Sequence, residues 1–237
     1  MKLVMFDMDG TLTDDFAIAE NCYVLAIEQA LGLPGVKTEW ETYPHTTSSY
    51  CLQEIVRRAR GTPPTPAESR AVQQRMIGIM SEVTRRTGRR TREIPGAAEA
   101  VRELRRRGYA VAIASGDWEA IARHKFATAG IPYEDLPAAF CEAAVPRTGI
   151  MQAARARAAA HHGVPDFERI TYVGDAAWDV RACRELGWPF VGVGAGEFAR
   201  RMPGLGVTHL VSHYLDFGAF LAAVEAAGPP RAAPVRL

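Results

Sequence analysis

The chain has 237 residues, of which 48% are hydrophobic and 23% are charged, and its formal net charge is +1. This composition is typical of a soluble globular protein with one substantial core and room for a smaller accessory domain. The near-zero charge excludes a general attraction for nucleic acid or anionic lipid. The four cysteines lack the spacing of a disulfide framework or a zinc site, so we expect free buried thiols in a reducing cytoplasm.

The amino-terminal stretch MKLVMFDMDG reaches an acidic residue after only four apolar positions, which is too short for a signal-peptide core. No other stretch approaches the roughly 18 uncharged apolar residues of a membrane span. We therefore expect a cytoplasmic protein that does not cross a membrane.

The first predicted element is a buried strand at residues 3–6, a short apolar run that ends at Asp7. Helix-like patterns without a convincing strand then fill residues 15–93, with helices expected near 16–30, 49–60 and 66–86. The densest basic run, five arginines between positions 85 and 92, is interpreted as a solvated connector, with contact to a nucleic-acid backbone as the alternative. The sequence thus predicts a helical domain, 15–93, inserted after the first strand.

From residue 94 onward, apolar strands alternate with helical patterns that end in glycine. The expected strands are 110–114, 170–173 and 190–193, and the expected helices are 97–107, 118–129, 150–162 and 177–186. This alternation predicts an α/β fold, a doubly wound, Rossmann-like and mostly parallel sheet covered on both faces. The core would comprise 1–14 and 94–228, and residues 229–237 are expected to form a flexible tail.

Acidic and small polar residues follow three of the predicted strands. They lie in DMDGTLTD after the first strand, in IASGD after the second and in VGDAAWD after the third. Ligands bind at the carboxyl ends of strands in open α/β sheets, so the three segments are expected to meet at one site.

These three motifs resemble those of the haloacid dehalogenase superfamily. DMDGTLTD, at a strand end near the amino terminus, resembles the family signature DxDGT. The interval of about 80 residues between Asp14 and Ile94 matches members that carry a helical cap domain. The resemblance covers the core almost end to end. It implies a hydrolase of phosphoric monoesters, similar to phosphoglycolate phosphatases and beta-phosphoglucomutase-like hydrolases.

The residue types at these strand ends fit phosphoryl transfer in two steps. A carboxylate can attack phosphorus to form an acyl phosphate that water then cleaves, and Asp7 is the predicted nucleophile. Its charge would repel a phosphate dianion, so the site needs a hard cation. Mg²⁺ would be held by Asp7, the main-chain carbonyl of Asp9 and Asp175. Asp179 could hold a coordinated water, with a helix cap as the alternative.

The second aspartate of the motif separates phosphoryl transfer from dehalogenation. In the family, the residue that matches Asp9 protonates the leaving oxygen and then takes a proton from water. Dehalogenases lack this aspartate because a halide leaves without protonation. Gly10 would let the backbone pass close to the substrate, and Thr11 is expected to contact substrate or cap the following segment.

Ser115 and Gly116 are expected to hold the phosphate at a helix amino terminus, with Asp117 as the cap of that helix. The family also uses a lysine near the phosphate, and none precedes GDAAWD where many members have it. Lys125 is the first candidate because a side chain about 10 Å along its helix leans back toward the amino terminus. Arg147, at the start of the next helix, is the second candidate and an expected substrate contact. The alternative for either residue is a solvated position on the face of its helix.

The loop between the first two helices of the inserted domain contains His45, Thr46 and Thr47. In capped relatives this segment closes over the phosphate and contacts the substrate, so these three residues are predicted to bind substrate. The alternative is that the preceding aromatic residues, Trp40 and Tyr43, only anchor the domain and that His45 is solvated.

The sequence therefore predicts a Mg²⁺-dependent phosphatase that acts on a small phosphorylated metabolite, without nucleic-acid or membrane partners. Two alternatives stay open, a phosphomutase of the beta-phosphoglucomutase type and a non-enzymatic phosphoacceptor that resembles a receiver domain. The substrate itself is not predicted, because cap loops vary while the core stays the same.

Overall fold

The computed structural model describes residues 1–14, 16–36 and 40–231. The strands within these ranges are β1 (Lys2–Phe6), β2 (Thr13–Asp14), β3 (Arg92–Glu93), β4 (Ala110–Ala114), β5 (Ala138–Ala139), β6 (Arg169–Gly174), β7 (Phe190–Val193) and β8 (Leu210–Val211). The helices are α1 (Phe16–Leu31), η1 (Trp40–Thr42), α2 (Ser48–Arg60), α3 (Pro66–Thr87), α4 (Ala97–Arg106), α5 (Glu119–Ala129), α6 (Arg147–His162), α7 (Ala177–Leu186), α8 (Gly196–Arg201), η2 (Met202–Leu205) and α9 (Phe217–Ala226).

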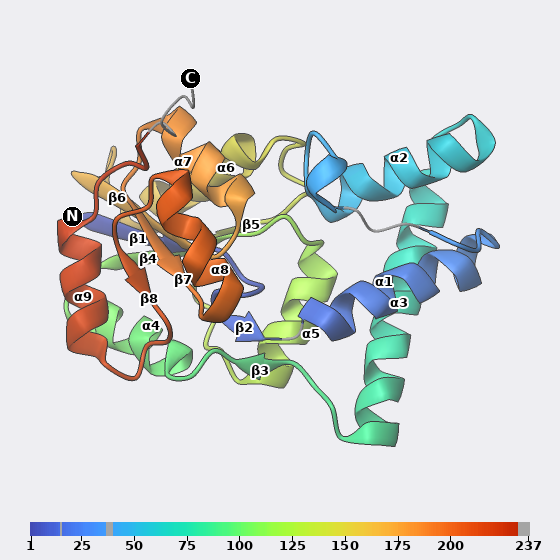
Figure 1. The fold of residues 1–237 in the computed structure, drawn as a ribbon, viewed down its shortest axis with the longest axis horizontal. Coiled ribbons are helices and arrows are strands. Elements are labelled where there is room, and N and C mark those ends of the chain that lie inside the picture. The colour runs from blue at the N-terminus through green and yellow to red at the C-terminus, as the bar shows by residue number, and fades with distance from the viewer. Residues whose placement is uncertain (15, 37–39, 232–237) are drawn as a thin grey trace.

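A parallel sheet in the order β5-β4-β1-β6-β7-β8 forms the centre of the described structure. β1 lies between β4 and β6, so the chain winds outward from β1 in both directions (Figure 1). The segments that follow β1, β4 and β6 therefore leave the sheet side by side, at the position where doubly wound folds bind ligands. The predicted fold class is confirmed.

Alternate side chains of β1 enter two hydrophobic cores, one on each face of the sheet. Leu3 and Met5 belong to a cluster that includes buried residues of α6 and α7. Val4 and Phe6 belong to a second cluster that includes buried residues of α4, α5 and α9. Both faces of β1 are thus apolar, as expected for a strand in a sheet covered on both sides.

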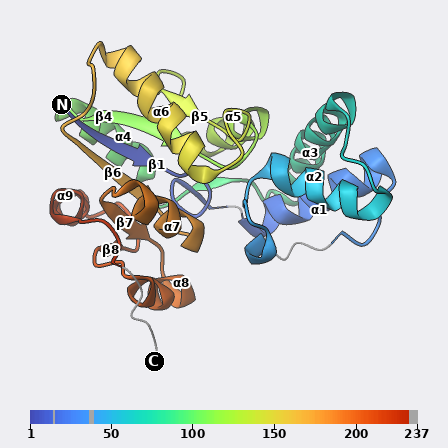
Figure 2. The same cartoon turned by 90° about the horizontal axis from the view of Figure 1, so that it is seen from above.

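Helices α1, α2 and α3, which we call the cap helices, lie beside the sheet, toward the carboxyl end of β1 (Figures 1 and 2). The two chain segments that join them to the sheet pair with each other. β2 and β3 are antiparallel, with Thr13 opposite Glu93, and the amide of Ile94 donates to the carbonyl of Leu12 at 2.9 Å. This two-stranded connection fixes where the cap helices leave and rejoin the core.

The start of α2 contacts the loop that follows β4. The amide of Ser48 donates to the carbonyl of Gly116 at 2.8 Å, and its hydroxyl donates to Asp117 at 2.9 Å. The indole of Trp118 donates to the hydroxyl of Ser49 at 2.8 Å. The ring of Trp118 also stacks on Tyr23 of α1, with centroids 5.5 Å apart. The cap helices and the sheet domain thus share polar and aromatic contacts at this loop.

The predicted strands and helices of the core agree with the structure to within a few residues, whereas the short strands β2, β3, β5 and β8 and the helices α8 and α9 were missed. β3 lies inside the span expected to contain no strand, and two residues are too few to show an alternating pattern. The flexible tail was expected from residue 229, yet the amide of Arg231 donates to Gly206 at 3.1 Å. The limits of the inserted domain, 15–93, and of the core stay predictions, and positions 15, 37–39 and 232–237 lie outside the described residues.

Within the described ranges, none of the helices combines the length and the hydropathy that a membrane crossing requires. The five arginines between 85 and 92 are all exposed, in agreement with a solvated connector at the end of α3.

Candidate active site

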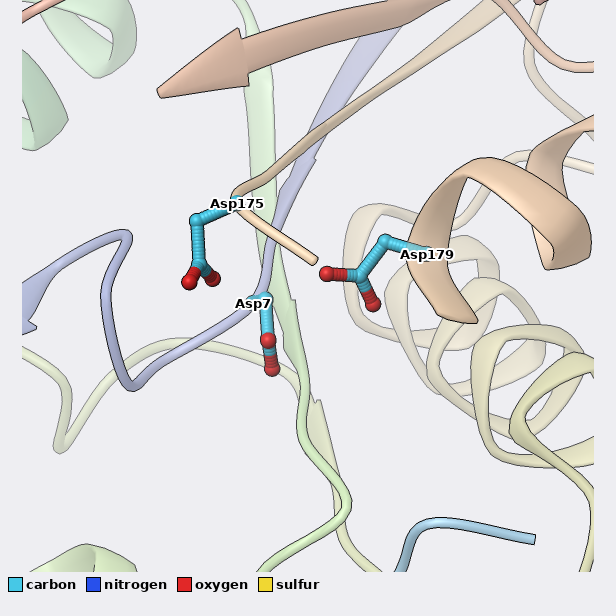
Figure 3. Close-up of side chains that lie close together, drawn as sticks. All are labelled: Asp7, Asp175 and Asp179. Atoms are coloured by element: carbon cyan, nitrogen blue, oxygen red, sulfur yellow. The ribbon is translucent and has the colours of Figure 1, made fainter. Parts of the chain in front are cut away.

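Three aspartates meet where β1 and β6 end and α7 begins (Figure 3). Carboxylate oxygens of Asp7, Asp175 and Asp179 lie within 4.8 Å of one another. Asp7 follows β1, Asp175 follows β6, and Asp179 points toward both from the first turn of α7. The amide of Asp7 continues the β1–β6 pairing by donating to the carbonyl of Val173 at 2.9 Å. The sheet register therefore brings together acids that are far apart in the sequence.

A glycine in the turn after β1 allows this close approach. Gly10 has a φ of +76°, which L side chains rarely adopt, and a Cβ there would lie 2.1 Å from Oδ2 of Asp175. Thr11 donates its hydroxyl to Oδ1 of Asp175 at 3.1 Å. Thr11 thus contacts Asp175, and it is not among the residues that line the cavity described below, so its role as a substrate contact or cap stays a prediction.

Burial raises the pKa of each carboxyl in this cluster, and neighbouring carboxylates add to the effect. Burial is the main cause at all three. The pKa of Asp7 is raised, although Arg147 partly lowers it. The pKa of Asp175 is raised well above its ordinary value, with Asp7 and Asp179 adding to the effect of burial. Burial and the charge of Asp7 raise the pKa of Asp179 to about 7. Such a cluster holds protons or a cation more tightly than isolated carboxylates do.

Arg147, the first residue of α6, is the basic residue beside Asp7. Its Nη1 lies 3.1 Å from Oδ1 of Asp7 and 3.6 Å from Oδ1 of Asp179. Burial lowers its pKa, but Asp7 and Asp179 more than compensate, so the pKa stays raised and the guanidinium stays charged. Lys125 was the first candidate for the basic group near the phosphate and Arg147 the second, and in the structure Arg147 is the one that contacts Asp7.

Lys125 instead contacts the second aspartate of the motif. Its side chain is 1% exposed, and Nζ lies 2.5 Å from Oδ2 of Asp9 and 2.9 Å from Oδ2 of Asp117. The other oxygen of Asp9 accepts from the hydroxyl of Thr13 at 2.9 Å. Asp117 in turn accepts from Ser48 at the start of α2. A chain of polar contacts thus leads from the cap helices to Asp9.

The expectation that Asp117 caps α5 is wrong. The residue at the cap position is Trp118, and it makes no side-chain cap hydrogen bond. The carboxylate of Asp117 pairs with Lys125 and accepts a hydrogen bond from Ser48. Its amide donates to the hydroxyl of Ser115 at 3.3 Å. Sequence reasoning missed this role of Asp117. The interval of eight residues to Lys125, about two helical turns, was the signal that could have linked the two charges.

A cavity of about 430 Å³ lies between the cap helices and the carboxyl ends of the strands. Most of the predicted site residues line it, namely Asp7, Asp9, Thr46, Thr47, Ser115, Gly116, Lys125, Arg147 and Asp175. Gly116 is closely packed there, since a Cβ would lie 2.9 Å from the carbonyl of Thr46 and 3.1 Å from Arg147. The loops after β1, β4 and β6 therefore share one cavity with the cap helices.

Two predicted substrate contacts have other partners in the structure. His45 does not line the cavity, and its ring packs edge-on against Tyr50 with centroids 5.1 Å apart. Thr47 lines the cavity, but its hydroxyl caps α2 by accepting from the amide of Tyr50 at 3.4 Å. Thr46 is the residue of this loop whose main chain approaches Gly116.

Substitution of Gly10 by alanine is expected to destabilise the fold and displace Asp175. The left-handed backbone costs an alanine about 1–2 kcal/mol, and its methyl group would overlap the Asp175 carboxylate. Thermal unfolding should show the loss. Gly35, which also has a positive φ but open space around it, provides the control for backbone strain alone. An equal destabilisation by Gly35→Ala would contradict the proposed contact with Asp175.

A family model described as haloacid dehalogenase-like hydrolase matches residues 1–187. A search of the curated proteins finds no match. Among solved structures, CbbY from Rhodobacter sphaeroides in complex with phosphate has a TM-score of 0.70 at 21% identity, covering 94% of this chain and 98% of that one. A proposed beta-phosphoglucomutase from Bacteroides vulgatus has a TM-score of 0.64 at 19% identity, with coverages of 95% and 90%.

A third similar structure is a predicted phosphoglycolate phosphatase from Haemophilus somnus, with a TM-score of 0.59 at 18% identity and coverages of 93% and 98%. At these identities the structures establish the shared fold, and the family model establishes the relationship. Because that model matches most of the chain, this protein is an enzyme that belongs to the haloacid dehalogenase-like hydrolases.

Proposed function

We propose that this hydrolase is a Mg²⁺-dependent phosphatase that acts on a small phosphorylated metabolite through a phosphoaspartate on Asp7. The position of Asp7 carries the proposal. Its carboxylate lines the cavity, beside two further carboxylates and the guanidinium of Arg147. The fold of CbbY, which was crystallised with phosphate and, as a mutant, with xylulose 1,5-bisphosphate, adds support for a phosphorylated small molecule.

Asp7 and Asp9 would divide the chemistry between them. An oxygen of Asp7 attacks phosphorus while the bond from phosphorus to the leaving oxygen breaks, and a protonated Asp9 gives its proton to that oxygen. Water then attacks the same phosphorus and gives a proton to Asp9, and the bond between Asp7 and phosphorus breaks. Lys125 contacts Asp9 directly and would hold its carboxyl group in position for both proton transfers.

The basic and hydroxyl groups of the cavity would hold the phosphate during both steps. Arg147 orients Asp7 through their 3.1 Å contact and balances charge on the phosphoryl oxygens. Ser115, which is buried directly after β4, lines the cavity and offers a hydroxyl donor. The hydrogen bond from the hydroxyl of Thr11 keeps the Asp175 carboxylate in place.

The aspartate cluster fits a hard divalent cation. Asp7, Asp175 and Asp179 offer oxygen atoms only, the donor type that Mg²⁺ prefers. Oδ1 of Asp179 is buried and accepts no hydrogen bond among the described groups, although Arg147 lies 3.6 Å away. The main-chain carbonyl of Asp9 stays a further predicted ligand. When bound, the ion would neutralise charge on the transferred phosphoryl group.

Phosphate release from a panel of monoesters tests the proposal. The panel contains sugar phosphates, phosphoglycolate, phosphoamino acids and nucleotides, each with and without Mg²⁺. We expect Mg²⁺-dependent release of inorganic phosphate from at least one compound. Conversion of a sugar phosphate into its isomer without release would identify a phosphomutase. A phosphoenzyme that forms with acetyl phosphate and decays slowly would identify a phosphoacceptor.

Substitution of Lys125 by methionine is expected to cost about 3–5 kcal/mol of folding free energy, because it leaves the charges of Asp9 and Asp117 without this cation. Phosphate release should fall as well. The double variant Lys125→Met/Asp117→Asn removes one of the two carboxylates and should recover part of the stability in urea unfolding. A double variant that is less stable than Lys125→Met alone would contradict the proposed balance of charges.

A further inference from the structure

The cavity extends well beyond the space that a phosphoryl group occupies. Its volume of about 430 Å³ is in the range of pockets that hold small organic ligands. The aspartates and the loop after β4 form one part of its lining, and residues of the cap helices and α7 contribute to the second part. The leaving group of a phosphate monoester held at Asp7 would occupy this second part, so its lining defines which leaving groups fit.

Aromatic and apolar side chains form that second part, from both the cap and the core. Tyr23 and Trp40 line it from the cap side, with ring centroids 5.4 Å apart, and Met76 of α3 lies with them. Trp178 of α7 lines it from the core side. These side chains make this part of the lining mostly apolar.

The aromatic side chains of this wall carry no charge, and the indole nitrogens of Trp40 and Trp178 have no hydrogen-bond partner among the described groups. The hydroxyl of Tyr23 donates to the carbonyl of Ser48 at 2.9 Å. Burial raises the pKa of Cys51 to about 12, so this thiol is neutral at physiological pH. These side chains therefore offer no charged partner to a charged leaving group.

The charges around the cavity disfavour a second anionic group on the substrate. Among the described lining residues, two cations accompany the carboxylates Asp7, Asp9, Asp14, Glu20, Asp117 and Asp175. Both cations, Lys125 and Arg147, are paired with carboxylates at the phosphate end. The described cap residues bring no lysine or arginine to the lining, whereas Glu20 of α1 brings a carboxylate. Among the described cap residues, a second phosphate or a carboxylate on the leaving group would thus meet the carboxylate of Glu20 and not a lysine or arginine.

We infer that the preferred substrate is a phosphate monoester whose leaving group is uncharged and carries a flat, apolar portion. This inference rests on the proposed phosphatase function. It disfavours phosphoglycolate, which carries a carboxylate, and the bisphosphates that a phosphomutase of this architecture would have to bind. Trp40 and Glu20 are the residues that would determine specificity, through apolar contact and through repulsion of anions.

The test compares substrates with similar leaving alcohols. kcat/KM for phosphate release is measured for benzyl phosphate, ethyl phosphate, phosphoglycolate and fructose 1,6-bisphosphate in Mg²⁺, with Asp7→Asn as the background. Benzyl phosphate should exceed phosphoglycolate by about tenfold or more, the scale of discrimination that one apolar contact surface provides. The ethyl ester should lie between them.

Two variants, each with a matched control, test whether the cavity wall causes the preference for benzyl phosphate over phosphoglycolate. Trp40→Ala should lower kcat/KM for benzyl phosphate by about tenfold and leave phosphoglycolate within about twofold. Leu25→Ala, which removes an exposed side chain of α1, should change neither. Glu20→Gln should raise kcat/KM for phosphoglycolate relative to benzyl phosphate. Glu28→Gln, at an exposed position of the same helix, should not.

Two results overturn the inference in distinguishable ways. Phosphoglycolate or the bisphosphate cleaved as efficiently as benzyl phosphate overturns the substrate class and leaves the phosphatase proposal intact. Absence of phosphate release from every monoester tested overturns the proposed function and the substrate class together. Because Glu20→Gln is a conservative change at a half-buried position, it keeps the test decisive even where Trp40→Ala is unstable.

Discussion

Substitution of Asp7 by asparagine is expected to abolish phosphate release, by at least about 10³-fold, and to leave the fold intact. An amide oxygen is a poor nucleophile toward phosphorus and cannot form the acyl phosphate. The side chain keeps its size, and loss of its charge relieves repulsion among the buried carboxyl groups. Steady-state phosphate release with and without Mg²⁺ provides the measurement, and the thermal midpoint shows whether folding is preserved.

Asp166→Asn is the control for Asp7→Asn, because it changes an exposed aspartate that pairs with Arg155 outside the cavity. This variant should retain full activity. Appreciable turnover by folded Asp7→Asn would exclude Asp7 as the nucleophile. Acid-quenched protein labelled from a phosphorylated substrate would then have to carry its phosphate elsewhere.

Without divalent metal, the protein is expected to lose stability as the pH rises from 5 to 8. Burial raises the pKa of Asp7, Asp175 and Asp179 in the folded state, the last to about 7, above the value near 4 of the unfolded chain. The folded state therefore binds these protons more tightly. Their contribution is fully present below about pH 4 and is lost as the pH rises through the folded-state values, at a cost on the order of a few kcal/mol.

Mg²⁺ should reverse that loss, because it binds the ionised carboxylates. In thermal unfolding with EDTA, we expect the midpoint to be about 5 °C or more lower at pH 8 than at pH 5. Added Mg²⁺ should raise the midpoint more at pH 8 than at pH 5. Asp179→Asn should weaken both effects, and Asp166→Asn should preserve them. An equal effect of Mg²⁺ at both pH values would argue against a cation site at the three aspartates.

The sequence predicts the core because its strands are apolar on both faces and its helices end in glycine. Both patterns can be recognised from residues that are close together in the sequence. The motifs after β1, β4 and β6 indicate the site for a similar reason, since parallel strands bring their carboxyl ends to one edge. Asp7 and Asp175 are thus brought together as expected, although 168 positions separate them.

Contacts that depend on three-dimensional packing were not predictable. Lys125 and Arg147 are both long basic residues, on two successive helices, and only the packing of α5 and α6 decides which reaches Asp7. Thr11 looks like a helix cap in the sequence, whereas its partner Asp175 comes from another strand. The apolar wall of the cavity combines Tyr23, Met76 and Trp178, which share no sequence pattern.

The hydrogen bonds between the start of α2 and the loop after β4 have a consequence for turnover. Ser48 and Ser49 form hydrogen bonds with the same loop that carries Ser115, so the cap helices cannot move away without disturbing the loop that we propose holds phosphate. Each of these bonds is replaced by one to water on separation, at a net cost of about 1 kcal/mol. We expect these hydrogen bonds to hold the cap helices weakly against the core. Product release would then be no faster than the rate at which these bonds break.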